Sequence, residues 1–269
     1  MRNWAAYLAL RAAVAFTGVL PEPVMRRLGR AAGTVWWLVD PRRRRFASRH
    51  MARLGAPRSA VREVFASYGR YWAESFWVRP ARFSQMRRFM SVDGLDNLAR
   101  ARAGGKGVIL ALPHLGNWEA AALIGADVNL PVVAVAEKLA NRRITEWFTE
   151  QRSMFGIEIV LTGSGRASRR RLIEALGEGK GVALLCDRDL SGRGVTVEFC
   201  GEKTTLPAGP ASLALRTGTE ILPVGMYFRP GPGYHAIIAP PVSTRLARPV
   251  PTGRSTSGST GPSRADSKP

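Results

Sequence analysis

A histidine and a glutamate with a spacing suited to proton transfer follow an apolar run near the middle of the chain. After residues 108–112 the sequence reads Pro-His-Leu-Gly-Asn-Trp-Glu and continues into Ala-Ala-Leu-Ile-Gly-Ala, which predicts a buried strand, a loop and a helix. His114 then lies in the loop and Glu119 in the first helical turn. A carboxylate on one ring nitrogen fixes the imidazole tautomer and leaves the other nitrogen to take a proton from an attacking hydroxyl. We therefore predict that His114 and Glu119 form a catalytic pair, although a structural histidine at a helix start has the same pattern.

The sequence does not contain the residue patterns of several other kinds of catalytic site. There is no Gly-x-Ser-x-Gly motif, and Cys186 and Cys200 have neither an adjacent base nor metal-ligand spacing. No metal ion, cofactor or covalent nucleophile is therefore expected, and two isolated cysteines fit a reducing, cytosolic compartment. Backbone N–H groups at the helix start after His114 are predicted to stabilise an oxyanion. The other histidines, His50 and His235, are assigned to structure.

The elements that must hold these residues follow from the pattern of apolar runs. Beyond Ser91, short runs alternate with Gly-containing and helical stretches, as is typical of alternating strands and helices. The predicted strands are 108–112, 132–136, 157–161, 182–185, 195–199, 221–226 and 234–238. Two stretches, around Lys106 and Lys180, have similar sequences. Each passes through Gly-Lys-Gly into an apolar run that ends in a polar cluster. We predict an α/β fold with a mixed, largely parallel central sheet flanked by helices.

Two amphipathic segments precede this part of the chain. The first twenty residues are rich in apolar side chains, but Arg11 interrupts them and Pro21 and Pro23 end them, so the stretch is too short and broken to span a bilayer comfortably. It has no signal-peptide cleavage site and continues into a second amphipathic segment, which begins at Val24. The two segments are predicted to be interfacial helices that lie on the membrane surface. Helices that simply pack on the domain fit the same pattern.

A third helical region is predicted from residue 60 to about residue 89. Val64, Tyr68, Trp72 and Phe76 recur at every fourth residue and therefore share one helical face. This face is assigned mostly to the core. Aromatic residues near the end of the region, Trp77 and Phe83, are predicted to touch lipid.

The charge of the chain indicates a polyanionic partner. Forty Lys and Arg against twenty Asp and Glu give a formal charge of +20. Between Arg26 and Arg58 there are ten arginines and a single acidic residue, Asp40, which predicts one basic face. Phospholipid headgroups, nucleic acid and CoA phosphates all satisfy this charge, as does a merely solvated arginine-rich surface. We prefer an anionic membrane, because no helix-turn-helix, zinc finger or RNA-binding motif is visible.

Several ordered blocks of the sequence resemble one family. His-Leu-Gly-Asn-Trp-Glu-Ala-Ala resembles the His-x4-Asp/Glu block of the bacterial lipid A biosynthesis acyltransferase superfamily, which also contains the actinobacterial phosphatidylinositol mannoside acyltransferases. Residues 134–160 are similar to its second conserved region, residues 187–224 to its third and fourth, and the N-terminal helices match as well. The resemblance covers roughly residues 1–242. The Arg- and Ala-rich composition, the glutamate at 119 and the Asp-Arg-Asp-Leu stretch make the mannoside branch the more similar one.

The resemblance implies an activity and a set of site residues. The activity is transfer of a fatty acyl group, with palmitoyl as the expected group, from acyl-CoA to a mannose hydroxyl of phosphatidylinositol mannoside, by a peripheral protein at the cytoplasmic face of the cell membrane. His114 is the implied general base and Glu119 its orienting partner. The implied substrate-binding residues, which would contact sugar hydroxyls or phosphate, are Glu137, Arg152, Asp187, Arg188 and Asp189. Ordinary surface ion pairing explains these five equally well. An apolar groove along Leu115, Trp118, Leu123 and Ile124 is expected to receive the acyl chain.

The pattern of the sequence divides the chain into three parts, and other functions stay open. The predicted parts are an N-terminal helical, membrane-associating region (1–90), an α/β acyltransferase core (91–242) and a disordered tail (243–269). The Ser-, Thr-, Gly-, Pro- and Arg-rich tail departs from the family pattern in the way that a truncation or an altered reading frame produces. The alternatives are a lipid A type lauroyl or myristoyl transferase, a nucleic-acid-binding protein and a thioesterase.

Overall fold

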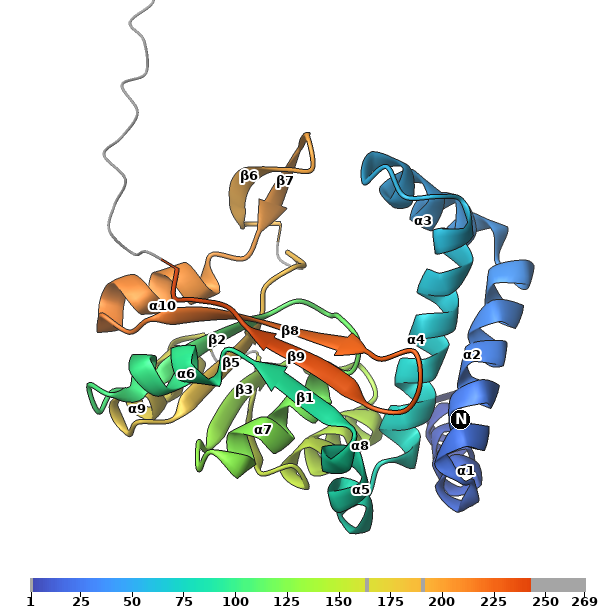
Figure 1. Ribbon diagram of the computed structural model, residues 1–269, viewed down its shortest axis with the longest axis horizontal. Coiled ribbons are helices and arrows are strands. Elements are labelled where there is room, and N and C mark those ends of the chain that lie inside the picture. Colours follow the sequence, from blue (N-terminus) through green and yellow to red (C-terminus); the bar gives the residue numbers. More distant parts are fainter. Residues whose placement is uncertain (1, 163–164, 190–191, 243–269) are drawn as a thin grey trace, which may run out of the picture.

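The computed structural model describes residues 2–162, 165–189 and 192–242, and it confirms the predicted α/β fold. The predicted tail, 243–269, lies outside the described residues. The central sheet has seven strands (Figure 1). Within the described residues, all neighbouring strands are parallel except β8 and β9. The order across the sheet is β1 (Met90–Asp93), β9 (Tyr234–Ile238), β8 (Ile221–Phe228), β2 (Val108–Leu112), β5 (Gly181–Leu185), β3 (Val132–Ala136) and β4 (Ile157–Leu161).

Two strands lack the apolar pattern that identified the others. β1 is only four residues long, and β7 (Glu202–Leu206) reads Glu-Lys-Thr-Thr-Leu. β7 pairs antiparallel with β6 (Val195–Phe199) in a separate ribbon, so the predicted strand 195–199 lies outside the central sheet. Most residues of this ribbon are exposed, which explains why β7 carries no buried apolar run.

Helices cover both faces of the central sheet because its strands bury side chains on both sides. Val108 and Leu112 pack with α6 (Leu95–Arg102), whereas Ile109 packs with α9 (Arg166–Gly177) and α10 (Gly209–Thr217). The other described helices from residue 83 onward are α5 (Phe83–Arg88), the 3-10 helix η2 (Trp118–Ala121), α7 (Ala122–Asp127) and α8 (Arg142–Ser153). The alternating side chains of β2 thus contribute to two layers of the core.

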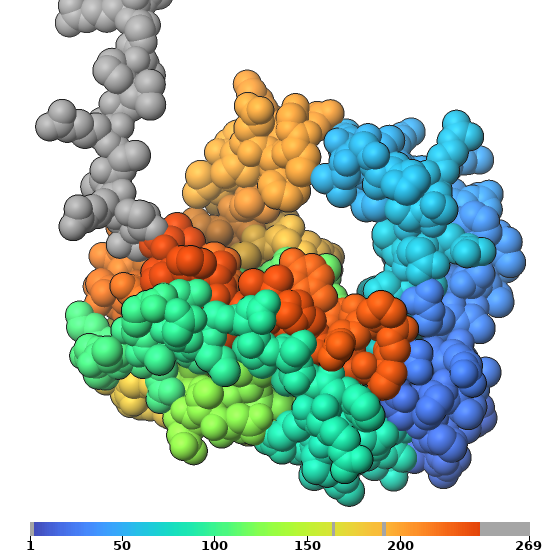
Figure 2. Space-filling model, viewed as in Figure 1, coloured from blue at the N-terminus to red at the C-terminus, as the bar shows by residue number. Residues whose placement is uncertain are grey.

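Helices precede the sheet and stand beside it (Figure 1). They are α1 (Arg2–Val19), α2 (Glu22–Val39), α3 (Pro41–Arg53), α4 (Ser59–Trp77) and the 3-10 helix η1 (Pro80–Arg82). Among the described residues, none of the helices combines the length and the apolar character that a bilayer crossing requires. Figure 2 shows α3 and the β6–β7 ribbon close together at one side of an opening in the molecule, and Arg53 Nε lies 3.3 Å from Glu202 Oε1 on the ribbon.

The face of α4 that packs into the protein differs from the predicted one. Val64 and Tyr68 are exposed, whereas Phe65 and Ala73 are buried. Trp77 is buried too, and its indole N–H donates to the Leu20 carbonyl, so it does not face lipid. Periodicity identified the aromatic face of α4, but α2 packs closely beside this face, where small residues allow the two helices to approach each other.

We expect the close packing of α2 on α4 to tolerate no side chain at Gly33. A Cβ at this position would collide with the backbone carbonyl of Phe65, and a backbone atom cannot move away cheaply. Gly33→Ala should therefore destabilise the protein by about 1–3 kcal/mol, measured as a lower urea midpoint at unchanged slope. Gly177→Ala is the control, because Gly177 ends α9 beside open space and alanine is the better helix former. Equal midpoints for the two variants would contradict the packing of α2 on α4.

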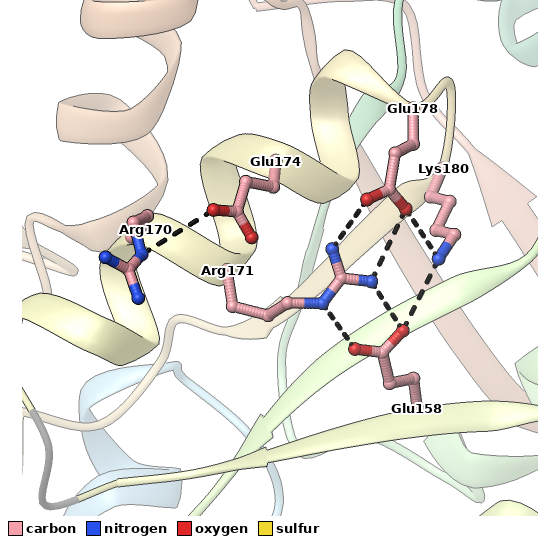
Figure 3. Close-up of polar contacts among 6 residues, drawn as sticks. All are labelled: Glu158, Arg170, Arg171, Glu174, Glu178 and Lys180. Carbon is pink, nitrogen blue, oxygen red and sulfur yellow. Dashed lines mark hydrogen bonds and ion pairs between the residues drawn. The ribbon is translucent and has the colours of Figure 1, made fainter.

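A group of ion pairs ties α9 to the sheet (Figure 3). Arg171 on α9 contacts Glu158 of β4 at 2.6 Å and Glu178 at 2.9 Å, and Lys180, next to β5, contacts Glu178 at 2.7 Å. The hydrogen bond from Arg171 lowers the pKa of Glu158, and the hydrogen bond from Lys180 lowers the pKa of Glu178. Charged side chains from α9, from β4 and from the turn before β5 therefore meet beside the sheet.

We expect these ion pairs to make stability depend on pH. A carboxyl group with a lowered pKa binds fewer protons in the folded than in the unfolded state, so its contribution is present above the unfolded pKa, about 4.3, and is lost as the pH falls through the folded pKa. In urea unfolding between pH 7 and pH 3, Arg171→Gln should reduce this loss of stability. The same change at Arg62, exposed on α4, should leave the loss unaltered, and parallel curves for all three proteins would contradict the assignment.

Candidate functional site

The loop after β2 brings His114 to a carboxylate at the end of the neighbouring strand. The His114 ring Nδ1 lies 2.7 Å from Asp187 Oδ1, and the His114 backbone N–H donates to Asp187 Oδ2 at 3.0 Å. β2 and β5 are parallel and in register, with Leu112 opposite Leu185, so both chains leave the sheet at the same edge. Polar residues at the carboxyl ends of adjacent parallel strands are typical of ligand sites in α/β proteins.

The contact with Asp187 determines what the His114 ring can do. An ionised carboxylate only accepts hydrogen bonds, so Nδ1 carries the proton and Nε2 carries the free electron pair. Burial raises the pKa of Asp187, but hydrogen bonds from the His114 side chain and backbone outweigh it and hold the pKa below its usual value. The imidazole is about one third exposed, which leaves it accessible to a substrate. A neutral, oriented imidazole of this kind is suited to general base catalysis.

The carboxylate of Glu119 faces away from this pair. Glu119 is buried, and its Oε1 accepts from Arg152 Nε at 2.9 Å while its Oε2 contacts the Ser75 hydroxyl at 3.4 Å. Among the described residues no hydrogen bond or ion pair joins Glu119 to His114. The predicted contact of Glu119 with the imidazole ring is therefore wrong, because Glu119 lies in a 3-10 turn that directs it toward α4 and α8. Burial raises the pKa of Glu119, against the opposing effect of Arg152.

Arg152 is occupied by the protein on three sides. Besides the ion pair with Glu119, its guanidinium lies 5.2 Å from the Trp118 ring centre and 5.3 Å from that of Phe148. Its side chain is 16% exposed. These contacts hold Arg152 as part of the wall behind the His114 loop, so the substrate contact implied for it would have to compete with Glu119.

The other predicted site residues follow β3 and β5. Glu137 and Arg188 are exposed, and each follows a strand at the same edge of the sheet as His114. Asp189 accepts a hydrogen bond from the backbone N–H of Gly194 at 2.7 Å, so its carboxylate stabilises its own loop. Cys186 adjoins Asp187, and burial, reinforced by the Asp187 charge, raises the pKa of its thiol, which makes it a poor nucleophile.

Two of the four residues predicted to line an apolar groove lie in the core, whereas Leu115 and Trp118 are partly exposed. Leu123 and Ile124 are buried in the core, so they line no groove. A groove of about 340 Å³ instead lies between α1, α2 and α4, a size within the range of small-molecule sites. Its aromatic lining is Phe16, Trp36, Tyr68, Trp72 and Phe76. The aromatic face of α4, which was assigned to the core, is thus part of the groove wall.

A series of aromatic contacts connects this groove with His114. Trp36 contacts Tyr68 at 5.5 Å between ring centres, and Tyr68 contacts Tyr71 at 6.2 Å. Tyr71 stacks on Trp118 at 6.5 Å, and the Trp118 ring lies edge-on to the imidazole of His114 at 6.0 Å. A series of ring contacts therefore connects the apolar groove with the histidine.

Sequence spacing missed two partners of the histidines. Asp187 is far from His114 in sequence. The similarity of the two Gly-Lys-Gly stretches could have indicated that the two residues are neighbours, because these stretches lead into the paired strands β2 and β5. His235 likewise has a carboxylate, with Nε2 3.3 Å from Asp93 Oδ2, since β1 and β9 are parallel neighbours. No pattern in the sequence identified Asp93 as a partner.

Comparison with known proteins adds a family to this geometry. The sequence profile described as bacterial lipid A biosynthesis acyltransferase matches residues 1–248. The chain is 36% identical over 189 residues to the phosphatidylinositol mannoside acyltransferase of Mycolicibacterium smegmatis and 37% identical over 183 residues to that of Mycobacterium tuberculosis. It is 27% identical over 234 residues to the lipid A biosynthesis palmitoleoyltransferase of Escherichia coli.

The aligned regions cover unequal shares of these proteins. The two mycobacterial alignments include 70% and 65% of this chain but 62% and 58% of the relatives. The alignment with the Escherichia coli protein includes 82% of this chain and 74% of the relative. The chain thus spans less than two thirds of the length of the mannoside acyltransferases that it matches.

Proposed function

Since this chain belongs to the bacterial lipid A biosynthesis acyltransferase family, we propose that it transfers a fatty acyl group to a hydroxyl of a glycolipid. His114 acts as the general base, and Asp187 orients its ring. The observation that carries the proposal is the 2.7 Å contact between His114 Nδ1 and Asp187 Oδ1 at the carboxyl edge of the sheet. This contact gives Asp187 the orienting role that sequence spacing assigned to Glu119.

The proposed reaction needs one base and no covalent enzyme intermediate. The acceptor hydroxyl oxygen attacks the thioester carbonyl carbon while its proton passes to His114 Nε2. The new C–O bond forms, the C–S bond breaks, and the proton on Nε2 then passes to the departing thiolate. Asp187 stabilises the imidazolium that exists between the two proton transfers.

The proposed acyl donor is acyl-CoA, with palmitoyl-CoA as the expected form. The groove between α1, α2 and α4 supports a long apolar substituent, because apolar and aromatic side chains line it. Its aromatic connection to His114 supports an acyl chain whose thioester end lies at the imidazole. No metal ion or further cofactor enters the proposal.

The proposed acceptor is a mannose hydroxyl of phosphatidylinositol mannoside. Relatives with that name share 36% and 37% identity with this chain, compared with 27% for the lipid A palmitoleoyltransferase. Glu137 and Arg188 are exposed near the His114 edge, where the carboxylate can bind sugar hydroxyls and the guanidinium can bind phosphate. Asp189 and Arg152 can join them only by giving up contacts within the protein.

The proposed location is the cytoplasmic face of the membrane, with the N-terminal helices in contact with anionic lipid. Helices α1 to α3 expose large apolar side chains, among them Trp4, Leu8 and Phe46, and α3 exposes several arginines. Apolar groups that enter the interface and arginines that meet headgroup phosphates are the two features that surface binding uses. Retention on phosphatidylinositol vesicles, without retention on duplex DNA at the same salt, is the expected result. Stronger retention on DNA would favour nucleic-acid binding.

A direct transfer assay tests the enzymatic proposal. The chain is incubated with radiolabelled palmitoyl-CoA and purified phosphatidylinositol mannoside, with a lipid A precursor or no acceptor in parallel reactions. Labelled mannoside is the expected product. Label on the lipid A precursor alone would replace the proposed acceptor, and release of free palmitate at a rate independent of acceptor would replace transferase activity with thioesterase activity.

A further inference from the structure

A buried carboxylate on α4 joins three parts of the protein at one point. Glu74 is 3% exposed. Its Oε1 accepts from Arg70 Nε at 2.7 Å on the same helix, and its Oε2 accepts from Asn117 Nδ2 at 3.0 Å and from the Tyr234 hydroxyl at 2.8 Å. Arg70, Asn117 and Tyr234 are buried as well. Three donors, from α4, the His114 loop and β9, therefore surround one carboxylate that the proposed reaction does not use.

Asn117 places this carboxylate at the end of the His114 loop. It precedes η2 and caps that helix, since its side-chain oxygen accepts from the backbone N–H of Ala120 at 3.4 Å. Its side-chain nitrogen is the group that donates to Glu74. The neighbouring residue, Gly116, has a φ of +58°, and a Cβ there would collide with the Met226 carbonyl of β8. The loop is thus held at its end by α4 and β8, three residues or fewer from His114.

The other contacts of the network hold the β8–β9 hairpin. Arg70 donates to the carbonyls of Arg229 and Gly233 at 2.9 and 3.2 Å, and its guanidinium lies 4.1 Å from the Phe228 ring centre. Burial, together with the Glu74 charge, keeps the pKa of Tyr234 well above its usual value, so its hydroxyl remains a donor. Arg70 and Tyr234 therefore connect α4 with the hairpin, whereas Asn117 connects it with the His114 loop.

A buried charged network of this kind contributes more to geometry than to net stability. The free-energy cost of removing a carboxylate and a guanidinium from water cancels most of their mutual attraction. A fully satisfied network nevertheless admits only one arrangement of its members. The position of Asn117 restricts the short loop that begins after Leu112, and hence the place where the imidazole meets Asp187. An error of about 1 Å in the place of a reacting group is enough to cost about a hundredfold in rate.

We infer that Glu74 and Asn117 are positioning residues for the transfer reaction: their hydrogen bond holds the loop so that His114 stays on Asp187. The inference rests on the proposed function. It assigns a task to the buried carboxylate of Glu74, which the proposed proton transfers do not use.

Two single substitutions separate positioning from simple stabilisation. Asn117→Ala and Tyr234→Phe each remove one donor to the same oxygen, Glu74 Oε2, and each variant keeps the Arg70–Glu74 ion pair. Asn117→Ala should lower kcat about 10- to 100-fold at unchanged KM, whereas Tyr234→Phe should leave kcat within about twofold. Glu74→Gln, in whatever fraction remains folded, should resemble Asn117→Ala. Equal kcat values for Asn117→Ala and Tyr234→Phe would overturn the inference.

A second readout does not depend on transfer activity. The backbone N–H of His114 is bonded to Asp187, so its hydrogen–deuterium exchange reports whether the loop stays on that carboxylate. Exchange in a peptide covering residues 113–120 should accelerate in Asn117→Ala and not in Tyr234→Phe. Equal exchange in the two variants would overturn the inference even in an active enzyme. Failure of the proposed function would give a different result. The unaltered chain would then transfer no acyl group, while the two variants would still differ in exchange as expected.

Discussion

Replacing His114 by alanine is expected to lower kcat for acyl transfer by about 10²- to 10⁴-fold, the usual contribution of a positioned general base. The thioester donor and the acceptor should still bind, so KM should change little. Because His114 is about one third exposed and, within the described part of the chain, its ring nitrogens bond only with Asp187, the fold should survive the change. Unfolding by urea, measured alongside kinetics with palmitoyl-CoA and phosphatidylinositol mannoside, separates loss of catalysis from loss of structure.

His235→Ala is the matched control for this prediction. The two residues are of the same type and have similar exposure, and His235 also touches a carboxylate, with Ser91 Oγ 2.9 Å from its Nδ1. It lies on β9, between β1 and β8, away from the loop that follows β2. Activity should persist in His235→Ala. Equal rates for the two variants would remove His114 as the base, and loss of activity only in His235→Ala would move the site to β9.

Asp187→Asn is expected to lower kcat by about 10²- to 10⁴-fold with the fold intact. An amide in place of the carboxylate no longer stabilises the imidazolium, and its NH₂ group favours the tautomer in which Nδ1 is the acceptor. Nε2 would then carry the proton and could not act as a base. Because the carboxylate is only half-buried, its replacement by an isosteric amide leaves no buried charge without a partner.

Glu119→Gln is expected to lower stability while leaving most of the activity, the reverse of the result expected for Asp187→Asn. This change leaves the Arg152 guanidinium beside a neutral group in a buried position, and breaking a buried ion pair typically costs about 3–5 kcal/mol. The variant should unfold at lower urea concentration, and its remaining folded fraction should keep kcat within about tenfold. If Glu119→Gln instead loses kcat at unchanged stability while Asp187→Asn stays active, Glu119 is the catalytic partner that the sequence spacing indicated.

Most strands of the sheet were predictable because burial on both faces requires runs of apolar residues in the sequence. Strands of a parallel sheet covered by helices are mostly apolar, and β2, β3, β4 and β9 have the predicted bounds. β1 and β7 were missed for the same reason, since one is four residues long and the other is mostly exposed. The positions of the polar residues that follow β2 and β5 were likewise visible in the sequence.

The sequence by itself determined the α/β class, most of the strand ends and His114 as the candidate base, because each depends on local composition and spacing. Only the tertiary structure decided which carboxylate meets the imidazole. Asp187 reaches His114 through the pairing of β2 with β5, whereas a 3-10 turn and an arginine from α8 draw the nearby Glu119 into the interior. Periodicity also identified the aromatic face of α4, yet glycines on α2 and α4 decided that this face would line a groove. Hydrogen bonds and close packing between distant segments depend on the arrangement of the whole chain, which no local pattern contains.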